Sequence, residues 1–267
     1  MDIFPSVVAA AFGLVIGSFF NVLIYRLPRN ESIVRPGSHC PDCNHAIKPW
    51  ENIPLMSYLF LRGRCPACGH RISLQYPAVE LLTGCAALAL WRLVISPGIA
   101  SEPSGWHMGI LALQSLALLM LIPLSVIDMK HYIIPDAFTL PGIVAAFIVS
   151  FFPGGLTPLQ CLLGMAVGCV PLFLVGHISK LLLKKEALGL GDIWLMAVIG
   201  GLWGWKIAVA AVVLASFSGS IAGFALLAFR ALSKDHKLPF GPFLAFGAWA
   251  SVLTFDTLFK LYCSWLG

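Results

Sequence analysis

Two aspartates at the ends of apolar segments are the side chains in this sequence best placed to do chemistry. Asp128 ends one such segment in Leu124-Ser-Val-Ile-Asp-Met-Lys-His, and Asp192 begins another in Gly189-Leu-Gly-Asp-Ile-Trp. An ionisable side chain at membrane depth is costly, so it tends to face a protein interior or a wet cavity. Two close carboxylates resist double ionisation, and one can keep a proton as an acid while the other activates water. The pair therefore predicts the catalytic dyad of a membrane-embedded aspartic protease.

Each aspartate also has a structural interpretation when it is considered alone. Asp192 would make a good N-cap, because aspartate accepts backbone N–H groups at a helix start. Asp128 could instead pair with Lys130 or His131 at the membrane boundary. These alternatives remain open at the level of the single residue.

Further residues near these segments bear on the same chemistry. Gly189 and Gly191 lack side chains, so a peptide strand or another helix can approach the backbone beside Asp192. A single Gly-x-Gly-Asp element is nevertheless a weak signal. Glu80 is another acid within an apolar segment, and its role stays open.

The polar segment 26–75 nearly repeats itself with a period of 25 residues. Its two halves contain Cys40-Pro-Asp-Cys43-Asn-His and Cys65-Pro-Ala-Cys68-Gly-His. Two Cys-x-x-Cys pairs can supply the four thiolates that Zn²⁺ prefers in a tetrahedron. Two disulfides are the alternative, but thiols on the cytoplasmic side of a membrane stay reduced. We therefore expect a structural zinc ion held by Cys40, Cys43, Cys65 and Cys68.

The residues that follow each cysteine pair suggest two zinc knuckles. Asn44 and Gly69 tolerate a left-handed backbone, which lets amide groups turn toward the sulfurs. His45 and His70 lie two residues beyond each pair. Because four cysteines already fill the tetrahedron, we expect both histidines outside the ligand set.

The composition predicts an all-α polytopic membrane protein. Only 11% of the residues are charged and 59% are hydrophobic, which excludes an ordinary soluble domain. A membrane-crossing helix needs about 20 apolar residues. We expect about eight transmembrane helices, over residues 4–24, 77–95, 107–127, 137–152, 158–183, 190–204, 207–230 and 240–265. The sixth is short and interrupted by glycines, so we expect it to tilt, break or re-enter.

The basic residues predict the orientation and the domains. Segment 26–75 holds seven of them and nothing before it is basic, so this segment is expected in the cytoplasm. Eight spans then place 14 of the 17 basic residues, and both aspartates, on that side. The expected parts are a first transmembrane helix at 1–25, a cytoplasmic zinc-knuckle domain at 26–75 and a helical membrane protease core at 76–267. The net charge of +5 reflects this bias and gives no reason to expect a nucleic-acid partner.

A series of motifs in shared order resembles the bacterial type IV prepilin peptidases, a family of Gly-x-Gly-Asp membrane aspartic proteases. The resemblance covers most of the chain. It is carried by the double Cys-x-x-Cys loop and by Gly17-Ser-Phe-Phe-Asn21, Pro49-Trp-Glu-Asn-Ile-Pro54, Tyr76-Pro-Ala-Val-Glu-Leu-Leu, Ile127-Asp128, Ile134-Pro-Asp136, Gly189-Leu-Gly-Asp192 and Pro239-Phe-Gly-Pro242.

The resemblance implies an enzyme that cuts the basic leader from prepilins or pseudopilins at the cytoplasmic face of the bacterial inner membrane, with Asp128 and Asp192 as its catalytic pair. It also implies N-methylation of the new N-terminus with S-adenosylmethionine, and it links Gly63 to that activity. The family commonly has an acid in place of Lys130 and a lysine in place of Trp194. We hypothesise that Lys130 now supplies the positive charge near the dyad.

Two other classes of function compete with the protease. A proton- or cation-coupled transporter would use the two aspartates as a relay. A membrane docking module would use the zinc loop as a platform, with the aspartates as caps. An inverted repeat would favour the transporter, and the sequence shows none. The docking module gives no reason for two acids at equal depth.

Overall fold

The computed structural model describes residues 3–97, 104–183, 188–229 and 238–266, and its secondary-structure elements in these ranges are helices, with two isolated β-bridges in the cysteine loop. The chain divides into two compact units, Met1–Ser101 and Glu102–Gly267. The domain boundaries expected from the sequence stay a prediction.

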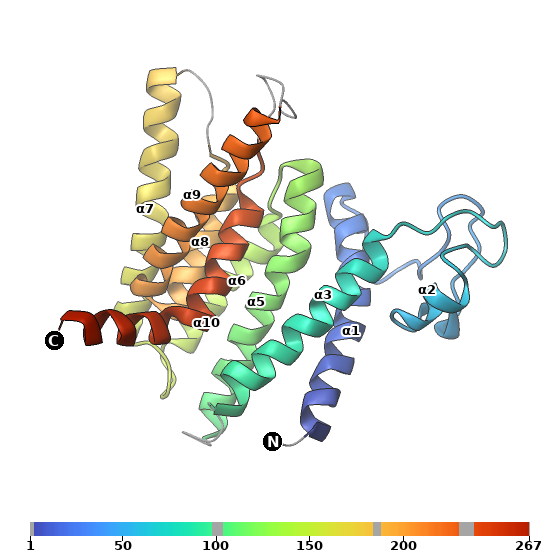
Figure 1. Ribbon diagram of the computed structural model, residues 1–267, viewed down its shortest axis with the longest axis horizontal. Coiled ribbons are helices and arrows are strands. Elements are labelled where there is room, and N and C mark those ends of the chain that lie inside the picture. The colour runs from blue at the N-terminus through green and yellow to red at the C-terminus, as the bar shows by residue number, and fades with distance from the viewer. Residues whose placement is uncertain (1–2, 98–103, 184–187, 230–237, 267) are drawn as a thin grey trace. The chain divides into compact units, whose positions relative to one another are not determined.

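The first unit pairs two long helices and carries the cysteine loop between them (Figure 1). Helix α1 (Ile3–Arg26) packs along α3 (Gln75–Leu90), which continues as a π-helical turn, Trp91–Ile95. The two backbones approach closely because α1 has glycines at the contact: a Cβ at Gly17 would lie 2.7 Å from the Cα of Glu80. Small residues at such contacts are typical of helix pairs in membranes.

The loop of the first unit is anchored to the end of α1. It contains the short helices η1 (Leu27–Arg29), η2 (Pro49–Asn52) and α2 (Met56–Phe60). The buried guanidinium of Arg26 donates hydrogen bonds to the carbonyl oxygens of Ser32 at 2.9 Å and Pro36 at 2.6 Å. Asn21 donates to the carbonyl of Tyr76 at 3.1 Å, which joins α1 to the start of α3. Side chains of α1 thus fix where the loop leaves and where it returns.

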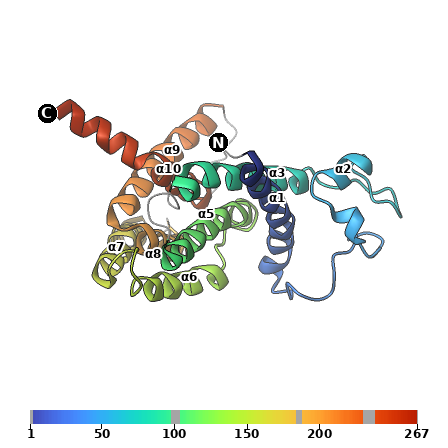
Figure 2. The same cartoon turned by 90° about the horizontal axis from the view of Figure 1, so that it is seen from below.

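Helix α8 forms the centre of the second unit. The helices are α5 (Gly105–His131), α6 (Asp136–Val149), α7 (Pro158–Leu183), α8 (Leu190–Trp203), α9 (Trp205–Ala228) and α10 (Gly241–Leu266). Figure 2 shows α8 among its neighbours, and it contacts α6, α7, α9 and α10. Nearly all its side chains from Asp192 to Leu202 are buried. Gly164 of α7 and Gly200 of α8 let these two backbones meet.

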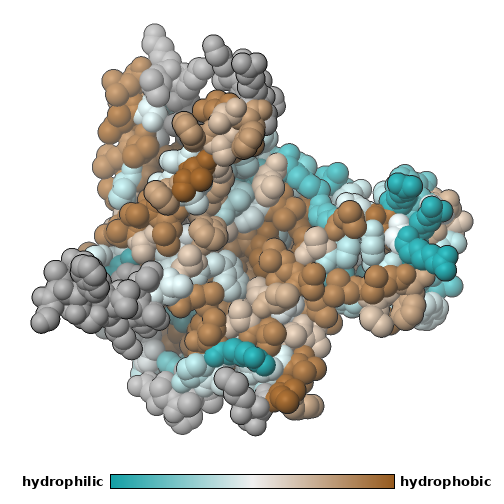
Figure 3. Space-filling view, in the orientation of Figure 1, coloured by the Kyte–Doolittle hydropathy of each residue, from teal (hydrophilic) through white to brown (hydrophobic). Residues whose placement is uncertain are grey.

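Each of the eight apolar segments predicted from the sequence coincides with a helix. Five helices are long and apolar enough to cross a membrane: α1, α3, α5, α7 and α9. Helices α6 and α8 have 14 residues each, or about 21 Å at 1.5 Å per residue, against a hydrocarbon core of about 30 Å. The expected short sixth helix is confirmed, whereas eight complete spans stay a prediction. In Figure 3 hydrophilic residues gather on the cysteine loop and hydrophobic residues cover most of the helical surface.

Candidate active site and metal-binding cluster

Asp128 lies in the last turn of α5 and is only 6% exposed. Its Oδ2 accepts a hydrogen bond of 2.9 Å from the backbone N–H of Gly241, the first residue of α10. Helix α10 is held beside α5 by a second bond, in which the indole N–H of Trp249 donates to the carbonyl of Leu118 at 3.0 Å. The start of α10 therefore fixes one oxygen of Asp128.

Asp192 is the third residue of α8 and is 8% exposed. The N-cap of this helix is Gly189, so Asp192 is not itself the cap. Instead its Oδ2 accepts the N–H of Gly189 at 3.3 Å, as the third residue does in a capping box. Its other oxygen, Oδ1, is buried and has no hydrogen-bond partner among the described residues. A buried carboxylate oxygen without a protein partner is unusual and is suited to a shared proton or a water molecule.

The fold brings the two aspartates together. They are close enough for the charge of Asp128 to act on Asp192. Helix α8 is tied to α5, since the side-chain amide of Gln114 donates to the carbonyl of Leu202 at 2.8 Å. The end of α5 and the start of α8 thus carry two buried carboxyl groups within electrostatic reach of one another.

Of the two glycines near Asp192, only Gly191 is required by its surroundings. A Cβ on Gly191 would lie 2.7 Å from the Cβ of Ile134, in the connection between α5 and α6. A Cβ on Gly189 would be 3.4 Å from Oδ2 of Asp192, which is an ordinary contact. Gly191 therefore lets the α5–α6 connection pack against the start of α8.

The two residues that depart from the family pattern occupy similar positions relative to the two aspartates. Lys130 and Trp194 each follow an aspartate by two residues, and both side chains are exposed. Residues two apart on a helix do not face each other. The hypothesis that Lys130 supplies charge to the dyad stays a prediction. The contact of Gly241 with Asp128 was not predicted from the sequence, although Gly241 is part of the Pro239-Phe-Gly-Pro242 motif.

The four cysteines of the loop form one cluster. Their sulfur atoms all lie within 4.8 Å of one another, with 3.9 Å between Cys40 and Cys68 and between Cys43 and Cys65. Four thiolates at about 2.3 Å from a tetrahedral Zn²⁺ would be about 3.8 Å apart. The separations fit a metal ion, and they are too long for the disulfide alternative, because an S–S bond is about 2.05 Å.

The two halves of the cluster have the same backbone geometry. Asn44 (φ 57°) and Gly69 (φ 74°) both adopt the left-handed conformation that was expected. In each half the N–H of the first cysteine bonds to the carbonyl of the following histidine, and the left-handed residue bonds back to the first cysteine. His45 pairs with Glu51 at 3.1 Å and His70 with Asp42 at 2.6 Å, so both histidines lie outside the sulfur cluster, as predicted.

These backbone groups also set the acidity of the thiols. The N–H groups of Cys68 and Ala67 lower the pKa of the Cys65 thiol from 9.0 to about 7. For Cys43 the N–H of His45 acts in the same direction, but desolvation and the neighbouring thiols outweigh it and raise the pKa to about 12. Cys65 therefore ionises before Cys43, and a thiolate is the form that binds a cation.

Two family models match the chain: the bacterial peptidase A24 N-terminal domain over residues 11–93, and the type IV leader peptidase family over residues 115–224. The chain is therefore a member of the type IV leader peptidase family, as its motifs indicated.

Individual relatives agree over nearly the full length. The prepilin leader peptidase/N-methyltransferase of Pseudomonas putida is 36% identical, covering 97% of this chain and 94% of that protein. The enzyme of the same name from Pseudomonas aeruginosa is 33% identical, covering 96% and 92%. That from Aeromonas salmonicida is 34% identical, covering 95% and 92%. No solved structure matches significantly.

Proposed function

We propose that this chain is a prepilin leader peptidase and N-methyltransferase, with Asp128 and Asp192 as the peptidase dyad. The observation that carries the peptidase assignment is the pair of buried, mutually repelling carboxyl groups, one of which has an oxygen without a protein partner. The names of relatives that cover the whole chain supply the substrate class and the second activity.

The two carboxyl groups take different parts in hydrolysis. The N–H of Gly241 supports negative charge on Asp128, because a hydrogen bond to a charged oxygen is stronger than one to a neutral oxygen. Asp128 removes a proton from water as the water oxygen attacks the scissile carbonyl carbon. Asp192 begins the reaction protonated. It gives this proton to the nitrogen of the scissile peptide bond as the bond breaks. The products are the leader with a new carboxylate and a mature protein with a free N-terminal amine.

The substrates and the membrane orientation follow from the same assignment. The enzyme acts on prepilins or pseudopilins in the bacterial inner membrane, where the lipid bilayer surrounds the apolar helices. The bias of basic residues toward segment 26–75 supports a cytoplasmic position for the cysteine loop and for the ends of α5 and α8. No nucleic acid takes part.

The cysteine cluster serves as a structural zinc site. The sulfur separations and the paired left-handed turns support this choice of metal. A loop with so little buried apolar surface draws much of its folding free energy from the ion. Chelation should therefore loosen the loop without touching the dyad residues.

The dyad is tested with the purified enzyme and a prepilin substrate. Asp128→Asn and Asp192→Asn should each lower the cleavage rate by about 10²–10⁴-fold, because each removes one proton-transfer group. Asp136→Asn is the matched control, since Asp136 is an exposed aspartate that also lies at a helix end. Cleavage by either dyad variant at the rate of the control would overturn the assignment.

A further inference from the structure

The first unit encloses a cavity of about 340 Å³ between the cysteine loop and the ends of α1 and α3. This volume lies in the range of about 300–1,000 Å³ that is typical of small-molecule sites. A second cavity, in the other unit between α5, α6 and α8, has only about 10 Å³ and holds no more than a water molecule. The first cavity therefore has room for a ligand.

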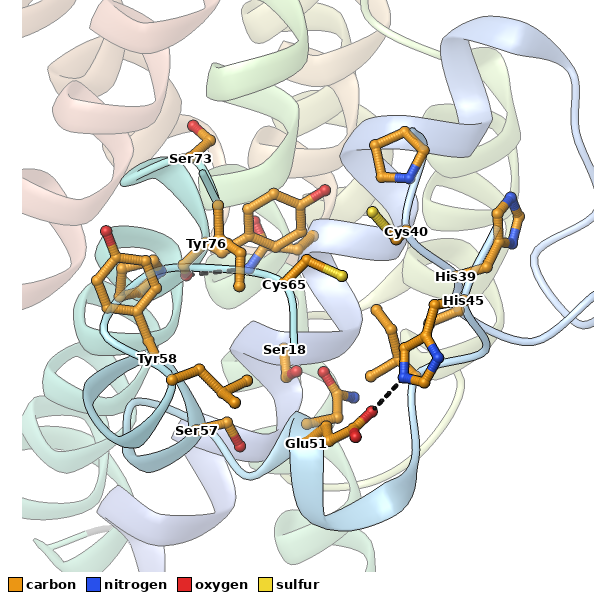
Figure 4. A pocket seen from close by; sticks show the side chains of 18 of the residues that line it. Ser18, His39, Cys40, His45, Glu51, Ser57, Tyr58, Cys65, Ser73 and Tyr76 are labelled. Atoms are coloured by element: carbon orange, nitrogen blue, oxygen red, sulfur yellow. Dashed lines mark hydrogen bonds and ion pairs between the residues drawn. The ribbon is translucent and has the colours of Figure 1, made fainter. Parts of the chain in front are cut away.

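The walls of this cavity suit a cationic ligand. Tyr25, Tyr58 and Tyr76 contribute aromatic rings, and Glu51 and Glu80 contribute carboxylates. In Figure 4 Tyr58 and Tyr76 lie on one side of the cavity and His45 and Glu51 on the other. Aromatic faces and carboxylates both attract positive charge. Arg26 and Arg71 also line the cavity; the guanidinium of Arg26 is bonded to loop carbonyls, whereas Arg71 can pair with a carboxylate that the ligand carries.

Glu80 is a buried residue of the cavity wall and is hydrogen-bonded to the loop. It is only 7% exposed, and its Oε2 accepts the backbone N–H of Leu55 at 2.8 Å. Leu55 has φ 60° and ψ −45°, and the N–H of Met56 bonds to the carbonyl of Pro54 at 2.7 Å. These values describe a classic γ-turn, which is rare and strained and persists only where its surroundings hold it. A buried carboxylate thus holds the loop in a strained turn at the edge of the cavity.

Gly63 controls the position of Tyr58. It has φ +65°, and a Cβ at this position would lie 2.8 Å from the hydroxyl oxygen and 2.9 Å from Cζ of Tyr58. The N–H of Gly63 bonds to the carbonyl of Tyr58 at 2.9 Å, so the two residues are held together. Gly63 is not part of the cavity wall. A side chain at position 63 would therefore change the cavity only by moving the Tyr58 ring.

We propose that this cavity binds the sulfonium methyl donor, S-adenosylmethionine, with the tyrosine rings and Glu80 contacting its cationic end. The inference rests on the N-methyltransferase function proposed above. In the reaction the substrate amine nitrogen bonds to the methyl carbon as the carbon–sulfur bond breaks, and that electron pair stays on sulfur. One proton leaves the amine for solvent. An N-terminal amine has a pKa of about 8, so about a tenth of the amine is already neutral at pH 7. The site therefore needs no strong base, and its main task is to bind the donor.

The role of Gly63 is tested with a matched pair of glycines in the full-length enzyme. Gly69 has nearly the same conformation, φ +74°, but a Cβ there would meet nothing within 4 Å. Both alanine variants therefore suffer similar backbone strain, and only one moves Tyr58. By calorimetry with S-adenosylmethionine, Gly63→Ala should weaken binding at least about tenfold and Gly69→Ala less than about threefold. Equal affinities in the two variants would overturn the proposal.

A second test separates charge from shape at Glu80. Glu80→Gln keeps an oxygen that can accept from Leu55 but removes the negative charge. It should weaken binding of the cationic S-adenosylmethionine about tenfold more than binding of the neutral S-adenosylhomocysteine. A purely structural role would weaken both ligands equally and would overturn the contact. A parent enzyme that cleaves leaders but neither binds nor uses the donor would instead overturn the proposed transferase function.

Discussion

Replacing Gly241 by alanine should lower the rate of leader cleavage about a hundredfold through a displacement of Asp128. A Cβ at position 241 would lie 2.7 Å from Oδ2 of Asp128 and 3.2 Å from its Cβ and Cγ. Reaching a van der Waals separation of about 3.5 Å requires a shift of about 0.8 Å. A misplacement of about 1 Å at a catalytic group costs on the order of 10²-fold.

Loss of the hydrogen bond leads to a similar magnitude. The N–H of Gly241 bonds to a carboxylate oxygen at 2.9 Å, and hydrogen bonds to charged groups contribute about 1.5–3 kcal/mol. At about 1.36 kcal/mol per factor of ten, this corresponds to roughly a ten- to hundredfold change in rate. The effect should fall on kcat, with KM nearly unchanged, because the peptide-binding surface is left intact.

The measurement is steady-state cleavage of a prepilin substrate by the full-length enzyme in detergent. Gly105→Ala is the matched control, because Gly105 is also the first residue of a long helix and a Cβ there meets nothing within 4 Å. Thermal unfolding of both variants checks that the fold is retained. A kcat for Gly241→Ala within about threefold of the control would refute the positioning role of this contact.

Three further results are expected. Gly191→Ala should destabilise the protein by about 1–3 kcal/mol through overpacking against the α5–α6 connection, whereas Gly189→Ala should change thermal stability little; equal losses would contradict the packing argument. Chelation should release about one zinc ion per chain and loosen the cysteine loop, so that its four thiols become open to alkylation; thiols that stay protected after the metal is removed would refute a structural zinc site. The double exchange Lys130→Asp with Trp194→Lys should retain leader cleavage, and a double variant less active than either single one would exclude charge compensation.

Patterns along the chain predicted the eight apolar helices and the cysteine cluster, since both depend on local spacing, but not the short helices η1, η2 and α2 of the loop. Apolar segments of about 20 residues located the helices, and the 25-residue repeat placed four sulfurs that the fold then gathers within 4.8 Å. Asp128 and Asp192 were paired by a topological argument that required only the order of the spans. The end of α6 was less predictable, because the helix ends at Val149 whereas apolar residues continue to Phe152.

Contacts between distant segments could not be predicted in this way. Gly241 is 113 residues from Asp128, and nothing local distinguishes a glycine that donates to a carboxylate from one that begins a helix. The γ-turn at Leu55 carries no glycine that would announce its strained backbone. Its partner Glu80 was noticed as an acid in an apolar segment, but its role depends on a loop that folds back from 25 residues away.

The short central helix α8 has a consequence for how the enzyme tolerates its membrane. A helix that contacts lipid must match the hydrocarbon thickness, and each ångström of mismatch costs a fraction of a kcal/mol. Helix α8 contacts α6, α7, α9 and α10, so protein rather than lipid surrounds most of its 14 residues. Its length of about 21 Å is thus freed from the bilayer thickness of about 30 Å. The depth of Asp192 is consequently set by the helices around it, and peptidase activity should vary little between thin and thick lipid bilayers.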